Sequence, residues 1–211
     1  MKQDIIDLPS GEFKSTTFLP TKSDTTSVRI TVFAGSRYDP KGKGGLAHLL
    51  EHLLVSGSKS FPNPRDLGNL VLAHGGTYDI YTDRECLTFE TKTTNENVED
   101  GFRYLSEIIF NPLFTENNLE REKQVIAEEI KSDSVSPESK YWLKVLKKVW
   151  PDSWKSDYIM GSVDTIRGIT PADISDFYMR LYTKQNMILV ASGKLIQKQI
   201  SLLIDQYFKI R

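Results

Sequence analysis

The sequence has 211 residues and a formal net charge of −1, a length that allows one sizeable hydrophobic core. We therefore expect a single domain over residues 1–211, and the balanced charge provides no basic surface for nucleic acid or an anionic membrane. Cys86 is the only cysteine, which excludes an intrachain disulfide and favours a reducing compartment.

The first residues, MKQDIIDLPSGEFK, differ from known targeting sequences. They lack the basic start and apolar centre of a signal peptide, and they are not Arg-rich or Ser-rich like a mitochondrial presequence. No apolar run in the chain approaches the length of about 20 residues that spans a membrane. We expect a cytoplasmic location without membrane or nucleic-acid partners, provided that nothing has been removed from the front of the chain.

Residue patterning predicts an α+β fold with one mixed, mainly antiparallel sheet covered by helices. Alternating and β-branched residues predict strands over 27–36, 76–83, 86–94 and 186–193. A flexible turn, DPKGKGG (39–45), follows the first strand. Helical spacing of apolar residues predicts helices over 45–57, 63–76, 96–110, 115–133, 137–149 and 171–182, and a closing helix to Ile210.

The predicted helix GLAHLLEHLLVSG (45–57) places three titratable side chains on one narrow stripe. At about 100° per residue, His52 lies about 40° from His48 and Glu51 about 60° on its other side, with the leucines opposite. Left unpaired in the interior, these groups would cost several kcal/mol. A divalent cation removes that cost, because neutral imidazoles coordinate it and a nearby carboxylate can act on bound water.

A second predicted helix offers a third ligand, because catalytic zinc usually takes three protein ligands and keeps one position open for water. In LEREKQVIAEEIKSD (119–133), Glu122 and Glu129 border the apolar stripe, whereas Glu128 points toward solvent. The residues alone leave open which inward carboxylate would complete the site.

Several segments together resemble the pitrilysin family, which includes insulin-degrading enzyme and the mitochondrial processing peptidases. HLLEH (48–52) is the inverted zinc motif H-x-x-E-H. EREKQVIAEEI follows it at the family's spacing, HGGTYDIYTDRECLTF resembles the family's glycine-pair strand, and MGSVDTIRGITPADISDFYMRLY resembles a late family segment.

The resemblance implies that His48, His52 and Glu129 bind Zn²⁺ and that Glu51 is the general base acting on the water at the metal. Glu122 matches a further family glutamate that orients groups around the ion. The implied reaction is hydrolysis of internal peptide bonds without a covalent intermediate. The substrate, an extended or unfolded peptide, would add to a sheet edge through backbone hydrogen bonds.

Two features depart from the family pattern. Asp79 and Ile80 stand where the family usually has a substrate-contacting Asn-Ala pair. The carboxylate could favour basic peptides or weaken binding, or it could only bond locally. The chain is also about half as long as the family's usual half-enzyme, and it lacks the later Arg and Tyr that hold the substrate carbonyl. The resemblance therefore implies a second homologous domain, a partner subunit or self-association.

Two other functions share sequence features with a zinc endopeptidase. A catalytically inert or regulatory peptidase-like subunit of a heteromeric complex is the non-enzymatic alternative, although no motif residue is lost here. S-ribosylhomocysteine lyases share the inverted motif but need catalytic and metal-binding cysteines, and Cys86 alone cannot fill both roles.

Four further features have ordinary structural interpretations. His74 precedes a glycine pair and is expected to end a helix, and Cys86 is expected inside a strand. KYWLKVLKKVW (140–150) predicts a core helix with a solvated basic face rather than a membrane or nucleic-acid surface. DPKGKGG lacks the spacing of a phosphate-binding loop.

Overall fold

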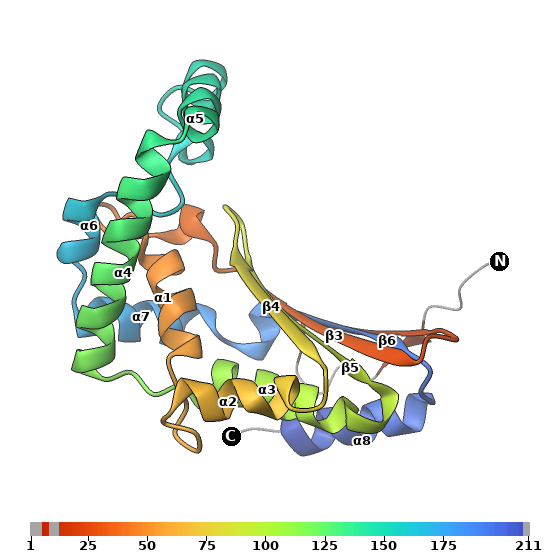
Figure 1. The fold of residues 1–211 in the computed structure, drawn as a ribbon. Helices are drawn as coiled ribbons and strands as arrows, with labels where there is room; N and C mark the ends of the chain where they lie inside the picture. Colours follow the sequence, from red (N-terminus) through yellow and green to blue (C-terminus); the bar gives the residue numbers. More distant parts are fainter. Residues whose placement is uncertain (1–5, 9–12, 209–211) are drawn as a thin grey trace.

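A computed structural model describes residues 6–8 and 13–208, and a sheet of six described strands forms its centre (Figure 1). The strand order is β1-β2-β6-β3-β5-β4, and only the β2–β6 pair is parallel. The predicted α+β class with a mainly antiparallel sheet is therefore confirmed. The strands are β1 (Ile6–Asp7), β2 (Ser15–Pro20), β3 (Thr25–Val32), β4 (Thr77–Thr82), β5 (Leu87–Thr94) and β6 (Met187–Gly193).

Three helices cover one face of this sheet: α2 (Pro64–Leu72), α3 (Val98–Phe110) and α8 (Gln197–Tyr207) (Figure 1). The strands alternate accordingly, and in β3 Val28, Ile30 and Val32 are buried. On the other face, Arg29 of β3 forms an ion pair with Glu90 of β5, and both side chains are partly exposed. One packed face and one polar face are typical of antiparallel sheets.

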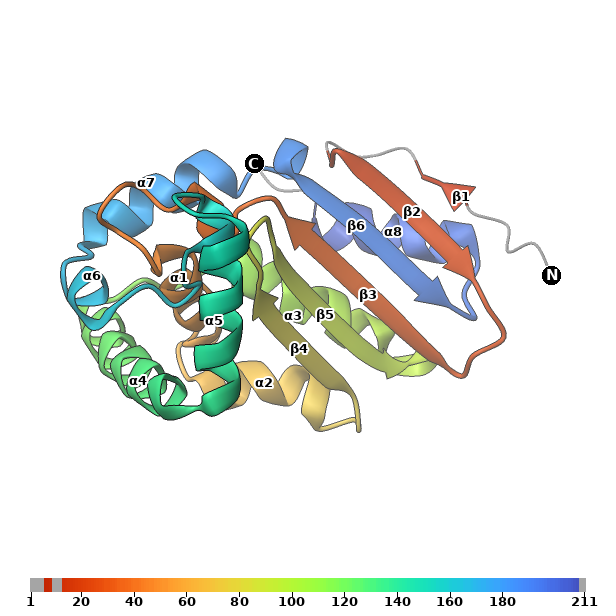
Figure 2. The ribbon, with the colours of Figure 1, turned by 90° about the horizontal axis from the view of Figure 1, so that it is seen from above.

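A second group of helices gathers at one end of the strands: α1 (Leu46–Val55), α4 (Glu116–Val135), α6 (Val163–Arg167) and α7 (Pro171–Leu181) (Figure 2). Within it, α1 is the most buried helix, because its apolar residues enter the core on several sides. Its buried residues are Leu46, Ala47, Leu49, Leu50, Leu53 and Leu54.

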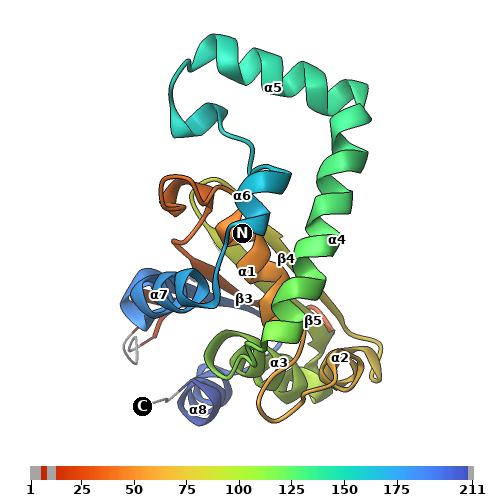
Figure 3. The same cartoon turned by 90° about the vertical axis from the view of Figure 1, so that its left-hand side faces the viewer.

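Helix α4 extends beyond this body and turns at Ser136 into α5 (Pro137–Val149), which crosses above the body (Figure 3). We call residues 136–156 the arm. None of the α5 residues, all of which the structure describes, is buried, and Trp142 is 53% exposed. The predicted helix over 137–149 is confirmed, but the interpretation of 140–150 as a core helix is wrong. Its apolar residues face a cavity and solvent, since the arm stands away from the core.

Among the described strands and α-helices, the sequence analysis missed three and placed the bounds of the others within a few residues. Strand β2 depends on parallel pairing with β6, which is remote in the chain, and β1 and α6 are too short to produce a periodic pattern. The predicted end of the last helix at Ile210 lies outside the described residues. Within the described ranges, no helix combines the length and apolar character required to cross a membrane.

Candidate metal centre

The start of helix α1 is anchored by the segment before it. The Asp39 carboxylate accepts hydrogen bonds from the backbone N–H groups of Gly45 (2.7 Å) and Ala47 (2.9 Å). Gly45 has φ = 92°, and a Cβ there would lie 2.3 Å from the Met160 carbonyl oxygen. Residues 39–45, expected to be a flexible turn, therefore fix the first turn of α1, on which His48 lies.

The three predicted metal ligands meet between α1 and α4. One potential ligand atom from each of His48, His52 and Glu129 lies within 4.8 Å of the others. Nε2 of His52 is 3.6 Å from a carboxylate oxygen of Glu129, and the two imidazole rings are 4.8 Å apart between centroids. The spacing of four residues on one helix thus places both rings beside the carboxylate of the other helix.

The chemistry of this donor set fits a zinc ion. Burial, with a smaller effect of the neighbouring His52, lowers the pKa of His48 to about 4, so its ring is neutral at pH 7. Nδ1 of His48 is buried without a hydrogen-bond partner in the described part of the chain. A neutral imidazole is the form that binds a metal, and two histidines with one carboxylate form a common catalytic zinc set.

Glu122 orients the imidazole ring of His52 through contact with its Nδ1 atom. Its Oε2 lies 3.2 Å from His52 Nδ1, while Oε1 accepts hydrogen bonds from Ser56 Oγ and Arg121 Nε, each at 3.0 Å. Burial opposes ionisation of Glu122, but these three partners together lower its pKa. For His52, burial lowers the pKa, but the surrounding carboxylates raise it overall, and Glu122 has the largest effect among them. The pairing directs Nε2 of His52 toward Glu129.

Glu51 lies on the same face of α1 and is held by the edge strand β4. The Thr82 hydroxyl donates a hydrogen bond to its carboxylate. Burial raises the pKa of Glu51, partly offset by Thr82 and His52. A carboxylate with a raised pKa accepts a proton near neutral pH more readily than an exposed one, as a general base requires.

Two cavities open on either side of Glu51. The smaller, of about 290 Å³, lies between α1 and β4 and includes Asp79 and Ile80, the two predicted substrate-contacting positions. The larger, of about 680 Å³, extends from His48 and Glu51 to the underside of α5. The site is therefore accessible from two directions, along β4 and beneath the arm.

The remaining sequence predictions have mixed outcomes. Glu128 points to solvent as expected, with its side chain 73% exposed. His74 lies just beyond the end of α2, outside the ligand cluster, with Nδ1 3.0 Å from a carboxylate oxygen of Asp100. Cys86 immediately precedes β5 rather than lying inside it, and it is partly exposed.

Sequence reasoning missed the residues that support the site. Ser56 follows His52 by four residues, so helical spacing could have indicated it. Thr82 and Arg121 become partners of Glu51 and Glu122 only through tertiary packing. Asp39 lay in a segment interpreted only as a turn.

The fold is similar to that of solved peptidase domains. The chain belongs to the insulinase family, peptidase family M16, whose sequence model matches residues 18–157. It is 26% identical over 180 residues to the mitochondrial-processing peptidase subunit beta of Dictyostelium discoideum, covering 85% of this chain and 38% of that protein. It is 25% identical over 177 residues to an uncharacterized zinc protease of Rickettsia felis, covering 84% and 43%.

Solved structures show the same fold. A protease from Helicobacter pylori superposes with a TM-score of 0.89 at 23% identity, over 99% of this chain and 50% of that one. The inactive domain of an M16 peptidase from Pseudomonas fluorescens has a TM-score of 0.87 at 16% identity, covering 97% of this chain and 50% of the other. The chain thus spans half or less of these relatives.

Proposed function

We propose that this chain is the zinc-binding domain of an endopeptidase that hydrolyses internal bonds of extended or unfolded peptides. A second homologous domain, a partner subunit or a second copy would complete the enzyme. The observation that carries the proposal is the convergence of His48, His52 and Glu129 within 4.8 Å, with Glu51 on the same face of α1. The name zinc protease of the Rickettsia felis relative supports the choice of metal.

The edge strand β4 is suited to hold the substrate. In the described part of the chain, no strand pairs with its outer side, so its backbone groups are available to an extended peptide. The hydrogen bond from Thr82 to Glu51 ties this edge to the candidate base. Asp79 and Ile80 lie on the same strand and border the smaller cavity. This placement supports a substrate-contacting role for these two residues.

The residues supply the proton transfers of peptide hydrolysis. Bound zinc would polarise the scissile carbonyl and lower the pKa of the attacking water. Glu51 takes a proton from that water and then delivers it to the departing amine nitrogen, so it ends the cycle ionised. Glu122 keeps His52 oriented throughout. Overall, the elements of one water molecule are added across the cleaved peptide bond, and the protein is left unchanged.

An inert or regulatory subunit is the second candidate. The structural likeness to an inactive M16 domain supports it, because that neighbour shares the fold and its title calls it inactive. The intact HLLEH segment and the clustered ligands favour the catalytic proposal over this alternative. A cytoplasmic location is a further part of the proposal.

Metal analysis and a peptide assay test the proposal together. The purified chain should bind about one zinc ion, and Glu129→Ala should lose it. Cleavage of a quenched peptide library should be abolished by chelator and reduced at least about 100-fold by Glu51→Gln, which should retain zinc. Glu128→Gln is the matched control, because this glutamate of α4 faces solvent. Cleavage that survives in Glu51→Gln would overturn the mechanism.

If the purified chain binds zinc but does not cleave peptides, the next experiment adds a candidate partner. Addition of a homologous second domain should then produce activity that again depends on Glu51. If no such addition produces cleavage, the inert-subunit alternative gains support.

A further inference from the structure

We propose that the outer surface of α5 is a docking surface for another protein, which presents an acidic, amphipathic helix to it. The inference goes beyond the proposed peptidase function and does not depend on it. The surface consists of a basic face, formed by Lys140, Lys144, Lys147 and Lys148, and an apolar ridge beside it. None of these lysines borders either cavity beside Glu51. The arm carries the surface away from the body, where a partner can reach it (Figure 3).

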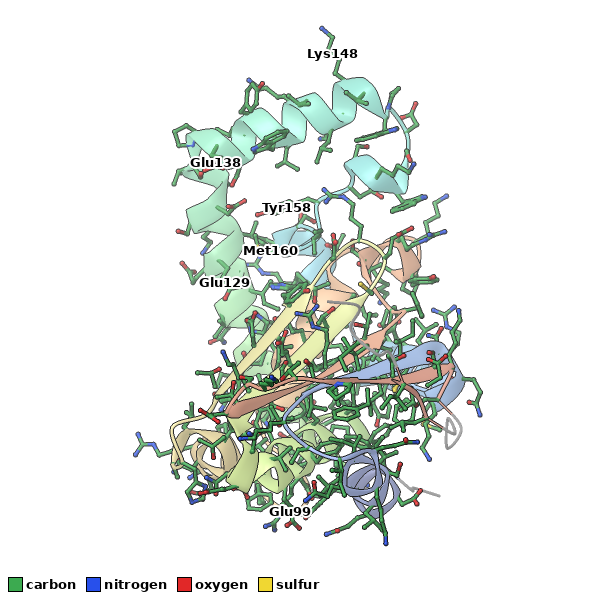
Figure 4. The ribbon with its side chains drawn as sticks, turned by 90° about the vertical axis from the view of Figure 1, so that its right-hand side faces the viewer. Glu99, Glu129, Glu138, Lys148, Tyr158 and Met160 are labelled. Atoms are coloured by element: carbon green, nitrogen blue, oxygen red, sulfur yellow. The ribbon has the colours of Figure 1, made fainter. Side chains whose placement is uncertain are left out.

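The basic face is concentrated and unpaired. At about 100° per residue, its four lysines lie within an arc of about 100° on more than two turns of the helix. All four are exposed, and Figure 4 shows Lys148 pointing away from the body. Lysines elsewhere in the described residues, such as Lys43 and Lys131, form ion pairs, whereas these four form none. Their charges are therefore available to an anionic group outside the chain.

The stability of the helix does not account for the basic face. Lys144 lies four residues from both Lys140 and Lys148, and like charges at this spacing repel each other. Lys140 lies close to the start of the helix, where a positive charge opposes the helix dipole. Only Lys147 and Lys148, in the last turn, favour the helix end. The clustering therefore destabilises α5 unless an acidic partner offsets the repulsion.

The apolar ridge favours a protein over other anions as the partner. Tyr141, Val145 and Val149 follow each other at intervals of four residues and form one row along the helix, next to the lysines. Tyr141 is 62% exposed and Val149 is 55% exposed, and neither borders the larger cavity. A partner helix can pack apolar residues against this row while its flanking carboxylates meet the lysines, as charged flanks do in coiled coils.

The other two anionic surfaces, a membrane and a nucleic acid, fit less well. The ridge is too narrow for insertion into lipid, because Trp142, Leu143 and Leu146 of the same helix line the cavity instead. A nucleic acid would use the lysines and leave the ridge exposed to solvent. The 13 residues of α5 span about 20 Å, so the contact with a partner helix is small, weak and sensitive to salt.

Binding of a designed acidic peptide tests the proposal. The probe is a fluorescein-labelled helical peptide of about three heptads, with Leu at the a and d positions and Glu at the e and g positions. Fluorescence anisotropy during titration with the full chain should give a micromolar dissociation constant. Raising NaCl from about 0.05 M to about 0.3 M should weaken binding at least about fivefold. A peptide with Gln in place of every Glu should bind at least about tenfold more weakly.

A charge reversal and its control separate this face from general electrostatic attraction. Lys144→Glu should weaken peptide binding at least about fivefold. The new carboxylate would lie between lysines, so the melting temperature should not fall. Lys198→Glu is the matched control, because this exposed lysine lies on α8, and binding should stay within about twofold of the parent. Tyr141→Ala should weaken binding about threefold through lost apolar contact.

Three results with the peptide would overturn the proposal. They are no binding to the parent chain, equal binding to Lys144→Glu and the parent, and an equal loss in Lys198→Glu. Tighter binding of phosphatidylserine vesicles or duplex DNA than of the peptide, with the same dependence on Lys144, would also overturn it. Chelator in every titration prevents cleavage of the probe, so failure here leaves the proposed zinc peptidase function untouched.

Discussion

Helices α1 and α5 both carry apolar residues at helical spacing, yet the fold uses them in opposite ways. Six residues of α1 are buried in the core, whereas none of α5, a fully described helix, is buried. The titratable stripe of α1 is therefore held by packing on its other sides, while the apolar side of α5 faces a cavity. The same kind of pattern thus places titratable side chains inside the body in one helix and apolar side chains along a cavity in the other.

The attachments of the two helices differ in the same sense. Asp39 fixes the first turn of α1, and α1 lies within the helical group at the end of the sheet. The arm meets the body through fewer contacts, including the bond from Arg84 to the Lys155 carbonyl and the stacking of Arg37 on Trp154 at 4.4 Å. We infer that the stability of the fold depends more on α1 than on α5.

The strongest test of this comparison is truncation of one apolar residue in each helix. Leu50→Ala should lower the free energy of unfolding by about 2–5 kcal/mol, because it opens a space in the core. Tyr141→Ala, on exposed α5, should change it by less than about 0.5 kcal/mol. Urea denaturation of both variants measures the difference. Equal losses would show that the arm is integral to the core.

A smaller effect is expected from the anchor of α1. Asp39→Ala removes the acceptor of two backbone N–H groups and should cost about 0.5–2 kcal/mol of unfolding free energy. It should also weaken zinc binding in a chelator competition, since His48 lies on that first turn. Asp39→Asn keeps one acceptor oxygen and serves as the matched control. Unaltered zinc affinity in Asp39→Ala would separate the anchor from the metal site.

The smallest expected effect on stability concerns Lys43, in the segment before α1, and its ion pair with Asp173 of α7. Lys43 donates to Asp173 at 2.7 Å, and this bond, with those from Thr170, lowers the Asp173 pKa to about 2 from an ordinary 3.8. Because the folded-state pKa is depressed, the stabilisation is complete above about pH 4 and is lost as the pH falls toward 2.

Thermal unfolding at several pH values measures this contribution. Asp173→Asn should melt a few degrees below the parent at pH 5, and the difference should disappear near pH 2. A difference that is constant across this range would assign the effect to lost hydrogen bonding rather than to the carboxylate charge.

The metal centre could be predicted from sequence because its geometry is mainly local. His48, Glu51 and His52 share one helical turn, and the direction of Glu129 follows from the stripe of its own helix. The meeting of the two helices and the choice of Glu129 rather than Glu122 as the third ligand required the family resemblance. The sheet class was also predictable, since β3 alternates along its length and β5 over its second half.

The misplacement of α5 and the missed β2 have one cause. A stripe such as that of Trp142, Leu143 and Leu146 indicates that a helix has an apolar side, but not which surface that side meets. Similarly, β2 has two inward residues, Thr16 and Phe18, and becomes a strand only beside β6. Both outcomes depend on packing partners that are distant in the chain, and local periodicity does not reveal these partners.

The unpaired outer edge of β4 has a further consequence for the behaviour of the protein at high concentration. Exposed strand edges are templates for sheet-to-sheet aggregation between copies. At the far end of the sheet this hazard is small, because β1 has two residues. On β4, Asp79 lies in the interior of the strand, so two copies aligned about this position would bring like charges together. A charged side chain in the interior of an exposed edge strand disfavours such pairing.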